Sequence, residues 1–408
     1  MLSKADAEAV RAQNRRLVID HFRHQPVSTR RRMSAVTGLS LSAASSIASD
    51  LVRVGILSES EPVDRQRSRG RPEVGLHLRG AAASVAVLKI SVGEIAVSLA
   101  DYQGQVLAAL RRDVDLSALS ADAFVALARS VLSDGLETLS PQHGPLRQVV
   151  ATVQGVTDGA ERRIIWSPIL KPRGIDLATP LEALTGARVR VLNDCGVMPE
   201  RFRWGNEIGS PDFAVLFIGF GVGMGLRLSG RTFRGAQSSA VEFGHLNHIP
   251  GGDLCRCGNR GCIEAYAGDY AIWRAAKGAS PSLFEKRVPD AAMKDLADAA
   301  REGETAAVLA FERAGEAIGY GLGRLFTLMD PLPVVFIGSG AEAMDLLEVS
   351  IRRAIKASAI DGIGADTPFV VMSDVDKVTL EASTTLALAA LDEAFSTAAS
   401  GPVEEAAE

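Results

Sequence analysis

The sequence predicts a small α+β head of roughly 80 residues followed by a much larger α/β body, and three observations lead to this prediction. Helical segments separated by short turns fill the first 55 residues, and two strand-like segments follow them. From Ser84 onward, short apolar strands alternate with glycine turns and helical stretches. Residues 1–80 carry a net charge of +6, whereas the rest of the chain carries −11.

Composition limits the class of protein further. The chain has 408 residues, of which 47% are hydrophobic and 23% charged, as in globular proteins of two or three domains. No run of about 18 apolar residues occurs, so we expect no membrane contact, and no secretion signal is recognisable. The few cysteines are clustered, which is typical of a reducing cytoplasm. A basic head on an acidic body indicates that the head meets a polyanion.

The head begins with a helical pattern over residues 11–23, which Pro26 ends. Ser28 and Thr29 can cap a second helix, and Gly38 can end it before a third begins. Helix, short glycine-containing turn and helix predict a helix-turn-helix. The apolar positions expected in the core of the head are Val10, Leu17, Val18, Phe22, Ile47 and Leu51.

The third helix, starting at Ser40 or Ser42, presents small side chains outside its apolar stripe. Small residues let a helix enter the major groove, where serine can bond to bases or phosphates. A polar face within a helical bundle explains the same pattern, and the segment alone does not decide between the two. The residues of this helix predicted to contact DNA are Ser40, Ser42, Ala43, Ser45 and Ser46.

Two strand-like segments, at 55–60 and 73–79, flank a loop that carries arginine at every second position from Arg65 to Arg71. In an extended chain that spacing places the arginines on one side, where they can meet a minor groove or phosphates. A solvated loop is the alternative, but the helices before it favour a DNA-binding wing. The predicted DNA contacts of the wing are Arg67, Arg69 and Arg71.

The body is predicted to be α/β. Three strands fall between residues 84 and 114, a helix covers 121–139, and a later strand ends at Asn193 and Asp194. Ligands of α/β proteins bind at such strand ends. A similar strand-rich unit recurs from residue 213, which indicates a duplicated fold.

The most informative segment carries three of the four cysteines, Cys255, Cys257 and Cys262, and His245 lies ten residues before the first of them. Zinc prefers a tetrahedron of thiolate and imidazole ligands, and a closed set of four is the structural kind. Three cysteines cannot all pair with one another, and a C-x-C disulfide would be strained. The spacing therefore predicts a metal site rather than buried thiols.

The ExGH motif at 242–245 and the C-x-C-G-x-x-G-C-x-E motif at 255–264 resemble the ROK family of repressors, open reading frames and sugar kinases. The head and its GRP-containing wing resemble the repressors of that family. The resemblance implies a winged helix-turn-helix (α+β) followed by a two-lobed α/β ribonuclease H-like (actin-like ATPase) ROK domain. The implied zinc ligands are His245, Cys255, Cys257 and Cys262, and the implied sugar contacts are Asn193, Asp194, Glu242, His245 and Glu264.

The predicted boundaries are a DNA-binding domain at 1–80, a ROK domain at 81–395 with a hinge near 200, and a disordered tail at 396–408. The ATP side departs from the pattern of the family's kinases. Lys89 stands where they carry a metal-facing carboxylate, and Val92 replaces a glycine. Phosphoryl transfer needs a metal held beside the phosphates, and Lys89 would repel Mg²⁺. The second glycine-rich loop keeps Gly219, Gly221, Gly223 and Gly225 but has Phe220 where kinases usually carry threonine.

Asp194 matches the aspartate that acts as the base in the family's kinases. In this chain it could instead accept a hydrogen bond from a sugar hydroxyl or cap a helix. The segments at 153–155 and 168–170 also depart from the family pattern, which leaves the identity of the sugar open. We therefore expect no catalytic residues and a sugar-responsive transcription regulator, a repressor of carbohydrate genes with a structural zinc. It would bind a palindromic operator as a homodimer or homotetramer. The alternatives are an ATP-dependent sugar kinase and a sugar-insensitive body that docks a transport or signalling protein.

Overall fold

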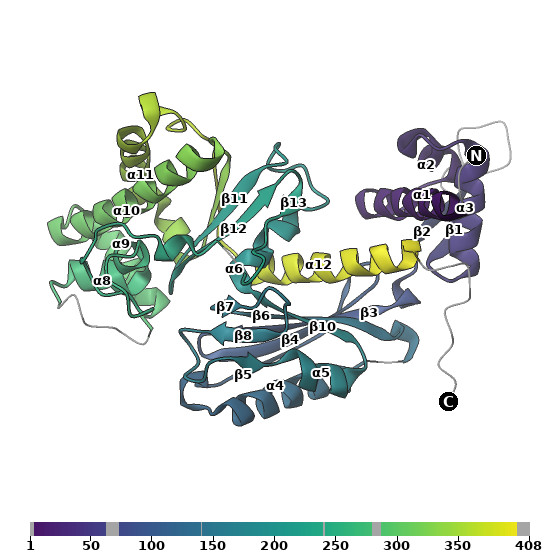
Figure 1. Ribbon diagram of the computed structural model, residues 1–408, viewed down its shortest axis with the longest axis horizontal. Coiled ribbons are helices and arrows are strands. Elements are labelled where there is room, and N and C mark those ends of the chain that lie inside the picture. The colour runs from purple at the N-terminus through teal and green to yellow at the C-terminus, as the bar shows by residue number, and fades with distance from the viewer. Residues whose placement is uncertain (1–3, 63–72, 140, 240, 280–286, 398–408) are drawn as a thin grey trace.

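The computed structural model describes residues 4–62, 73–139, 141–239, 241–279 and 287–397. A small head lies at one end of the molecule, a first lobe lies beside it, and a second lobe lies at the far end (Figure 1). Among the described helices no single one is long and apolar enough to cross a membrane, although the bent pair Arg30–Thr37 and Leu41–Arg53 passes that test by length and composition.

The head is a winged helix-turn-helix, as predicted. Its elements are α1 (Lys4–His24), α2 (Arg30–Thr37), α3 (Leu41–Arg53) and the antiparallel strands β1 (Leu57–Pro62) and β2 (Val74–Leu78). The chain bends by 118° between α2 and α3, within the range of helix-turn-helix motifs. Thr29 and Ser40 cap the two helices, and Gly38 ends α2 in the left-handed region at φ 73°.

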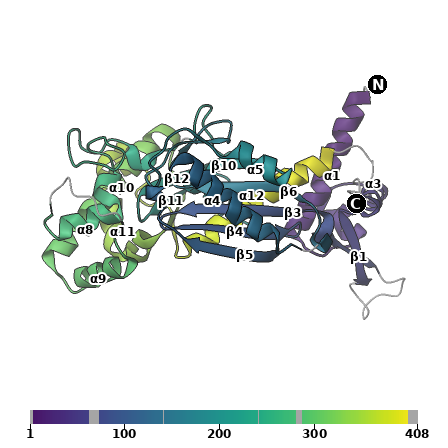
Figure 2. The same ribbon diagram turned by 90° about the horizontal axis from the view of Figure 1, so that it is seen from below.

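Part of the predicted core of the head was wrong. Val10 is 50% exposed, because the first half of α1 projects beyond the other helices (Figure 2), and Leu17 is 37% exposed. Ile47 is only half-buried. The core is instead formed by Val18, Ile19 and Phe22 of α1 with Met33, Ala44, Ala48 and Leu51. The predicted wing arginines, Arg65, Arg67, Arg69 and Arg71, lie outside the described residues.

The first lobe is a five-stranded sheet in the order β10-β6-β3-β4-β5. The strands are β3 (Ser84–Ser91), β4 (Glu94–Asp101), β5 (Val106–Asp113), β6 (Leu146–Val153) and β10 (Arg188–Asn193). Helices α4 (Ala121–Leu136) and α5 (Ala178–Thr185) cover one face, and α12 (Val375–Thr397) covers the other. Helix α12 extends two residues into the segment expected to be a tail, because the Ser396 side chain is buried. Residues 398–408 lie outside the described part of the chain.

The second lobe repeats this topology. Its sheet has the order β13-β12-β11-β14-β15. The strands are β11 (Phe213–Ile218), β12 (Val222–Leu228), β13 (Arg231–Thr232), β14 (Val334–Ile337) and β15 (Phe369–Met372). The helices around it are α8 (Asp269–Ala276), α9 (Asp290–Arg301), α10 (Thr305–Met329) and α11 (Met344–Ser358). In each sheet the first three strands in chain order pair antiparallel with one another. The last two strands in chain order are added in parallel on the other side of the first strand. The sequence predicted the duplication, and the two-lobed, ribonuclease H-like arrangement is the one that the family resemblance implied.

Candidate functional site

The five residues predicted to contact a sugar line one pocket between the lobes. Asn193 and Asp194 come from the end of β10 in the first lobe, and Glu242, His245 and Glu264 come from the second. The parallel strands β3, β6 and β10 all end at this edge, with Asn193 beside Val153. The strand-end position therefore brings the first-lobe residues to the cleft.

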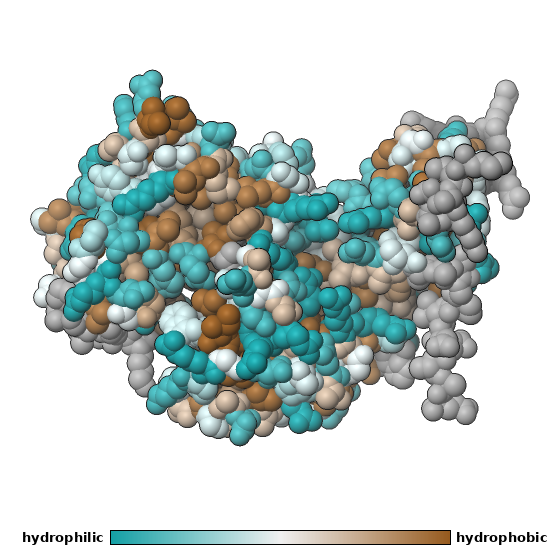
Figure 3. Space-filling model, viewed as in Figure 1, coloured by the Kyte–Doolittle hydropathy of each residue, from teal (hydrophilic) through white to brown (hydrophobic). Residues whose placement is uncertain are grey.

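The pocket has a volume of about 70 Å³, below the range of ordinary ligand pockets. It borders a cavity of about 660 Å³, and Gln154, Asp194, Phe217 and Phe220 line both spaces. The two spaces are therefore neighbouring parts of one cleft, and the surface is hollowed between the lobes in Figure 3. A larger ligand would need the pocket to widen towards the cavity.

Asn193 takes the capping role that had been considered for Asp194. Its side-chain oxygen accepts from Gly196 N at 2.7 Å, and its amide donates to Gly155 O at 2.7 Å. Asp194 begins the short helix α6 (Asp194–Val197), and its carboxylate accepts from Cys195 N at 2.9 Å. Asn193 thus fixes the turn, while the Asp194 side chain lines the pocket.

Carboxylates dominate the electrostatics of the pocket. Burial raises the pKa of Asp194 to about 6, and the nearby charge of Glu242 adds to the rise. Burial also raises the pKa of Glu242, with a further contribution from Glu264. Glu264, at the start of α7 (Glu264–Ala267), is 7% exposed and accepts from Val222 N at 3.3 Å. Such a set of acceptors suits a ligand that presents several hydroxyl donors.

Aromatic side chains form a wall of the pocket that the sequence reasoning missed. Trp166 lies at the end of β8 (Arg163–Trp166), and its ring meets the ring of His245 edge to face, with centroids 6.0 Å apart. Phe217, Phe220 and Pro168 complete the apolar lining. The signal available in the sequence was the position of Trp166 beside the divergent segment 168–170.

The four predicted metal ligands form a cluster whose ligand atoms all lie within 4.8 Å of one another. The sulfur atoms of Cys257 and Cys262 are 3.8 Å apart, and Cys255 Sγ is 3.7 Å from His245 Nδ1. A tetrahedron with zinc–sulfur bonds of about 2.3 Å requires sulfur atoms roughly 3.8 Å apart. A disulfide requires about 2.05 Å, and all four cysteines are free. The cluster therefore fits a tetrahedral metal ion.

The His/Cys cluster and the pocket share His245. His245 presents Nδ1 to the thiols and also lines the pocket. Cys255 Sγ lies 3.5 Å from Glu264 Oε1.

Gly261 closes the loop at φ 83°, where a Cβ would lie 1.8 Å from the Ile249 carbonyl oxygen. His248 lies off the cluster, with its ring against Tyr266 and Tyr320.

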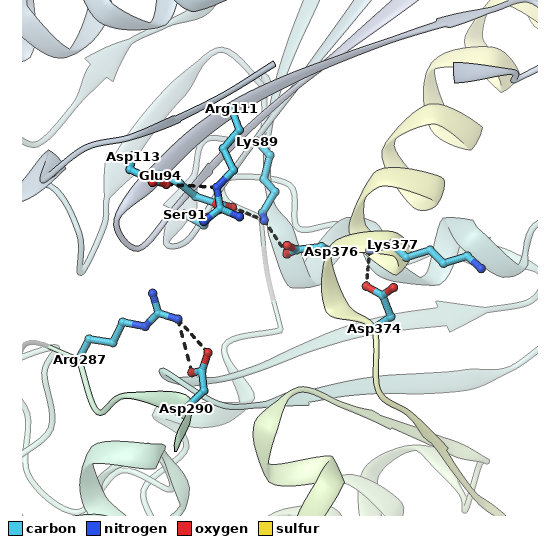
Figure 4. A network of polar contacts seen from close by, with 10 residues as sticks. All are labelled: Lys89, Ser91, Glu94, Arg111, Asp113, Arg287, Asp290, Asp374, Asp376 and Lys377. Carbon is cyan, nitrogen blue, oxygen red and sulfur yellow. Dashed lines mark hydrogen bonds and ion pairs between the residues drawn. The ribbon is translucent and has the colours of Figure 1, made fainter. Parts of the chain in front are cut away.

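Ion pairs of the chain's own side chains border the larger cavity (Figure 4). Lys89 donates to Glu94 and, at 2.5 Å, to Asp376 at the start of α12. Arg111 contacts the other oxygen of Glu94 at 2.7 Å. The Lys89 and Glu94 side chains are only 19% and 8% exposed. The acids at this point of the cleft are thus neutralised by cations of the chain itself.

The glycines of the second glycine-rich run have a packing role. A Cβ on Gly223 would lie 2.5 Å from Cys195 Sγ, and one on Gly225 would lie 2.4 Å from the Cys195 carbonyl oxygen. β12 thereby packs closely against α6. Phe220 lies under the guanidinium of Arg256, at 3.9 Å from its ring centroid. Close packing therefore accounts for Gly223 and Gly225.

The predicted DNA contacts of α3 gather at its N-terminal half. Ser40, Ser42 and Ser46 are exposed, whereas Ala43 and Ser45 are half-buried. Ala44 and Ala48 face the core with no exposed surface, which allows α3 to pack closely in the head. The exposed serines therefore lie on the outer face of the second helix of the helix-turn-helix.

The chain has a two-lobed body with a His/Cys cluster that could hold a metal ion beside its cleft, preceded by a winged helix-turn-helix. The ROK family model matches residues 89–387, and the chain therefore belongs to the ROK family.

Relatives of two kinds are similar to this chain. The xylose repressor of Bacillus spizizenii is 25% identical over 368 residues, covering 88% of this chain and 91% of the repressor. The NagC regulator of Escherichia coli is 27% identical, covering 57% of this chain and 58% of NagC. The glucokinase of Streptomyces coelicolor is 30% identical, covering 53% of this chain and 72% of the kinase.

A crystal structure of a ROK family transcriptional regulator, a homolog of the E. coli Mlc protein, has the same fold. The TM-score is 0.77 at 22% identity, and the match covers 96% of this chain and 99% of the regulator. The similarity to ROK regulators thus extends over the full length, head included. It agrees with the order of domains that the sequence predicted.

Proposed function

We propose that this protein is a sugar-responsive, DNA-binding transcription regulator of the cytoplasm, a repressor of genes for carbohydrate uptake or metabolism. One observation carries the proposal. The five residues expected to contact a sugar line one pocket, whereas Lys89 at the neighbouring cavity pairs with Glu94 and Asp376 and would oppose a metal–phosphate group there. The full-length similarity to a xylose repressor supports it.

In this proposal residues 1–80 bind DNA, residues 81–395 bind the sugar, and the lobes move about a hinge near residue 200. The exposed serines of α3 and the wing arginines Arg67, Arg69 and Arg71 contact the operator. Two copies read the two halves of a palindrome, so half-site spacing follows from the dimer axis. A ligand that prefers one arrangement of the domains changes the affinity for DNA.

The sugar hydroxyls donate to Asp194, Glu242 and Glu264. Asn193 holds the turn, and the imidazole of His245 donates through its second nitrogen. Zinc would be held by His245 Nδ1 and by the thiolates of Cys255, Cys257 and Cys262. A closed set of four ligands makes it structural, and it supplies the cross-link that fixes the loop carrying His245.

A sugar kinase is the second candidate. The relation to a glucokinase and the position of Asp194 at the strand end favour it. A general base with a pKa near 6 would suit proton removal from a hydroxyl. Formation of a sugar phosphate from ATP, lost in Asp194→Asn, would establish the kinase. We expect none, because Lys89 opposes Mg²⁺ at the phosphate position.

The experiment that tests the regulator is a DNA selection. The purified protein is mixed with fragmented DNA from its own source, and the bound fragments are sequenced. We expect enrichment of one palindrome, and the neighbouring genes would identify candidate sugars. A bound fraction that shows no shared sequence and disappears with salt would contradict the proposal, because that is the behaviour of non-specific binding.

A further inference from the structure

Arg23, in the last turn of α1, is buried between the head and the body. Its guanidinium donates to both carboxylate oxygens of Asp392 in α12, at 2.9 and 2.8 Å. It also donates to the Tyr102 carbonyl oxygen, directly after β4, at 2.7 Å. The Tyr102 hydroxyl donates to Asp392 at 2.7 Å. We call Arg23, Tyr102, Asp392 and Trp204, whose ring lies 5.0 Å from the Arg23 guanidinium, the head joint.

The head joint is more buried than the ion pairs within the head. The side chains of Arg23 and Asp392 are 3% and 12% exposed, and Tyr102 has no exposed surface. The Arg31–Glu73 pair, by contrast, stays within the head, and its side chains are 80% and 40% exposed. Exposed pairs contribute little, whereas a buried bidentate pair fixes a geometry. The head is therefore held on the body in one orientation.

A short segment connects the pocket to this joint. Asn193 and Asp194 line the pocket, and Trp204 lies ten residues after Asp194. Between them lie α6 and the 3-10 helix η4 (Met198–Phe202), both of which contact α12. Arg201 Nε bonds to Glu381 of α12 at 2.9 Å. A displacement of the strand end at the pocket therefore acts on both Trp204 and α12.

Helix α12 provides a parallel connection. It runs along the sheet of the first lobe from the cleft to the head, where its last turns lie beside α1 (Figures 1 and 2). Asp376 in its first turn bonds to Lys89 at the cavity, and Asp392 near its other end bonds to Arg23. One hydrophobic cluster also contains Val18 of the head and Leu386 of α12. The head and α12 thus move together or separate at the joint.

We propose that the head joint positions the DNA-binding head on the body and transmits the filling of the sugar pocket to it. This inference rests on the proposed function, which it deepens by naming the residues of the coupling. Bidentate pairing tolerates little displacement, so the joint has two states, made and broken. Arg23, Tyr102, Trp204 and Asp392 are positioning residues, since they reach DNA and sugar only through the elements they join.

The test compares Asp392→Asn and Tyr102→Phe with Glu393→Gln. The last removes the same charge from the next residue of α12, which is exposed, and so serves as the matched control. For each variant, affinities for the selected palindrome and for a scrambled duplex are measured at one salt concentration. The measurements are repeated with D-xylose, D-glucose and N-acetyl-D-glucosamine. Hydrogen exchange of residues 17–24 is followed by mass spectrometry, and circular dichroism establishes folding.

In the wild type and Glu393→Gln we expect one sugar to change palindrome affinity by about fivefold or more and to change exchange at the end of α1. Asp392→Asn should bind that sugar as the wild type does but lose the change in both readouts. Its preference for the palindrome over the scrambled duplex should also fall, because two heads must keep one spacing.

The outcomes separate the two proposals. A wild type that prefers no palindrome, or responds to no sugar, contradicts the proposed function. Folded Asp392→Asn and Tyr102→Phe variants that keep the wild-type palindrome preference, sugar response and exchange overturn the head joint, even if the regulator itself is established. Should Asp392→Asn fail to fold, Tyr102→Phe, which removes a single hydroxyl, decides by the same three measurements.

Discussion

Removal of the metal ligand Cys257 is predicted to loosen the loop that carries the sugar contacts. Cys257→Ser breaks a four-ligand cluster whose ligand atoms lie within 4.8 Å of one another. The variant keeps three of the four ligands and places a serine hydroxyl where the fourth thiolate was. It should hold zinc more weakly, because zinc prefers thiolate to a hydroxyl oxygen. We therefore expect the purified variant to contain much less than one zinc per chain.

The size of the effect follows from the loop that the metal closes. His245 and Cys262 enclose 18 residues, and closing a loop of about that length stabilises a fold by roughly 3 kcal/mol. For a domain of this size, about 1 kcal/mol corresponds to a shift of roughly 2–4 °C in the melting temperature. Loss of zinc should thus lower the melting temperature by about 6–12 °C. Because Glu242, His245 and Glu264 flank this loop, sugar affinity should fall roughly tenfold or more.

The assay combines metal analysis, thermal melting and sugar titration of the wild type, Cys257→Ser and Cys195→Ser. Cys195 is a buried thiol outside the cluster, so its variant should keep one zinc per chain. A strong chelator should reproduce the Cys257→Ser melting temperature in the wild type. Unchanged zinc content, melting temperature and sugar affinity in Cys257→Ser would refute the reasoning.

Three further predictions concern the cleft. Burial raises the pKa of Asp269 to about 6. The cost of burying its ionised carboxylate in the folded state is therefore absent below about pH 4 and complete above about pH 6. Asp269→Asn should raise the free energy of unfolding at pH 7.5 by on the order of 3 kcal/mol. Urea melts of both proteins between pH 4 and 8 check this, and parallel pH curves would count against it. Gly223→Ala should cost about 1–3 kcal/mol, because its Cβ would lie 2.5 Å from Cys195 Sγ; an unchanged melting temperature would contradict the close packing. Asp194→Asn should weaken sugar binding by roughly tenfold or more in calorimetry while the fold persists, and wild-type affinity would remove Asp194 from the site.

Local signals in the sequence predicted most of the fold. Thr29, Gly38 and Ser40 mark helix ends by their backbone preferences, and the structure confirms all three. The position of Asn193 and Asp194 at a strand end predicted a ligand contact there, and the resemblance to the ROK family implied that they lie beside the motif around His245; residues of both segments line one pocket. What depends on neighbouring residues or on a motif was therefore available from the sequence.

Contacts between distant parts of the chain could not be predicted in this way. Lys89 was recognised as a misfit for Mg²⁺, but its partner Asp376 lies 287 residues away. The buried pair of Arg23 and Asp392 spans 369 residues. Val10 was misplaced in the core because helical periodicity gives a face of α1 but not how far the covering helices extend. Tertiary packing decides each of these features.

In the proposed function, a sugar in the interlobe pocket changes the affinity of the protein for DNA. The most direct test titrates the wild type into its selected palindrome, at fixed salt, with and without D-xylose, D-glucose and N-acetyl-D-glucosamine. The account predicts that one of them shifts the dissociation constant by about 5- to 150-fold, and that Asp194→Asn requires far more of that sugar. Palindrome binding that stays constant at saturating sugar would contradict the account, as would conversion of the sugar to its phosphate by ATP.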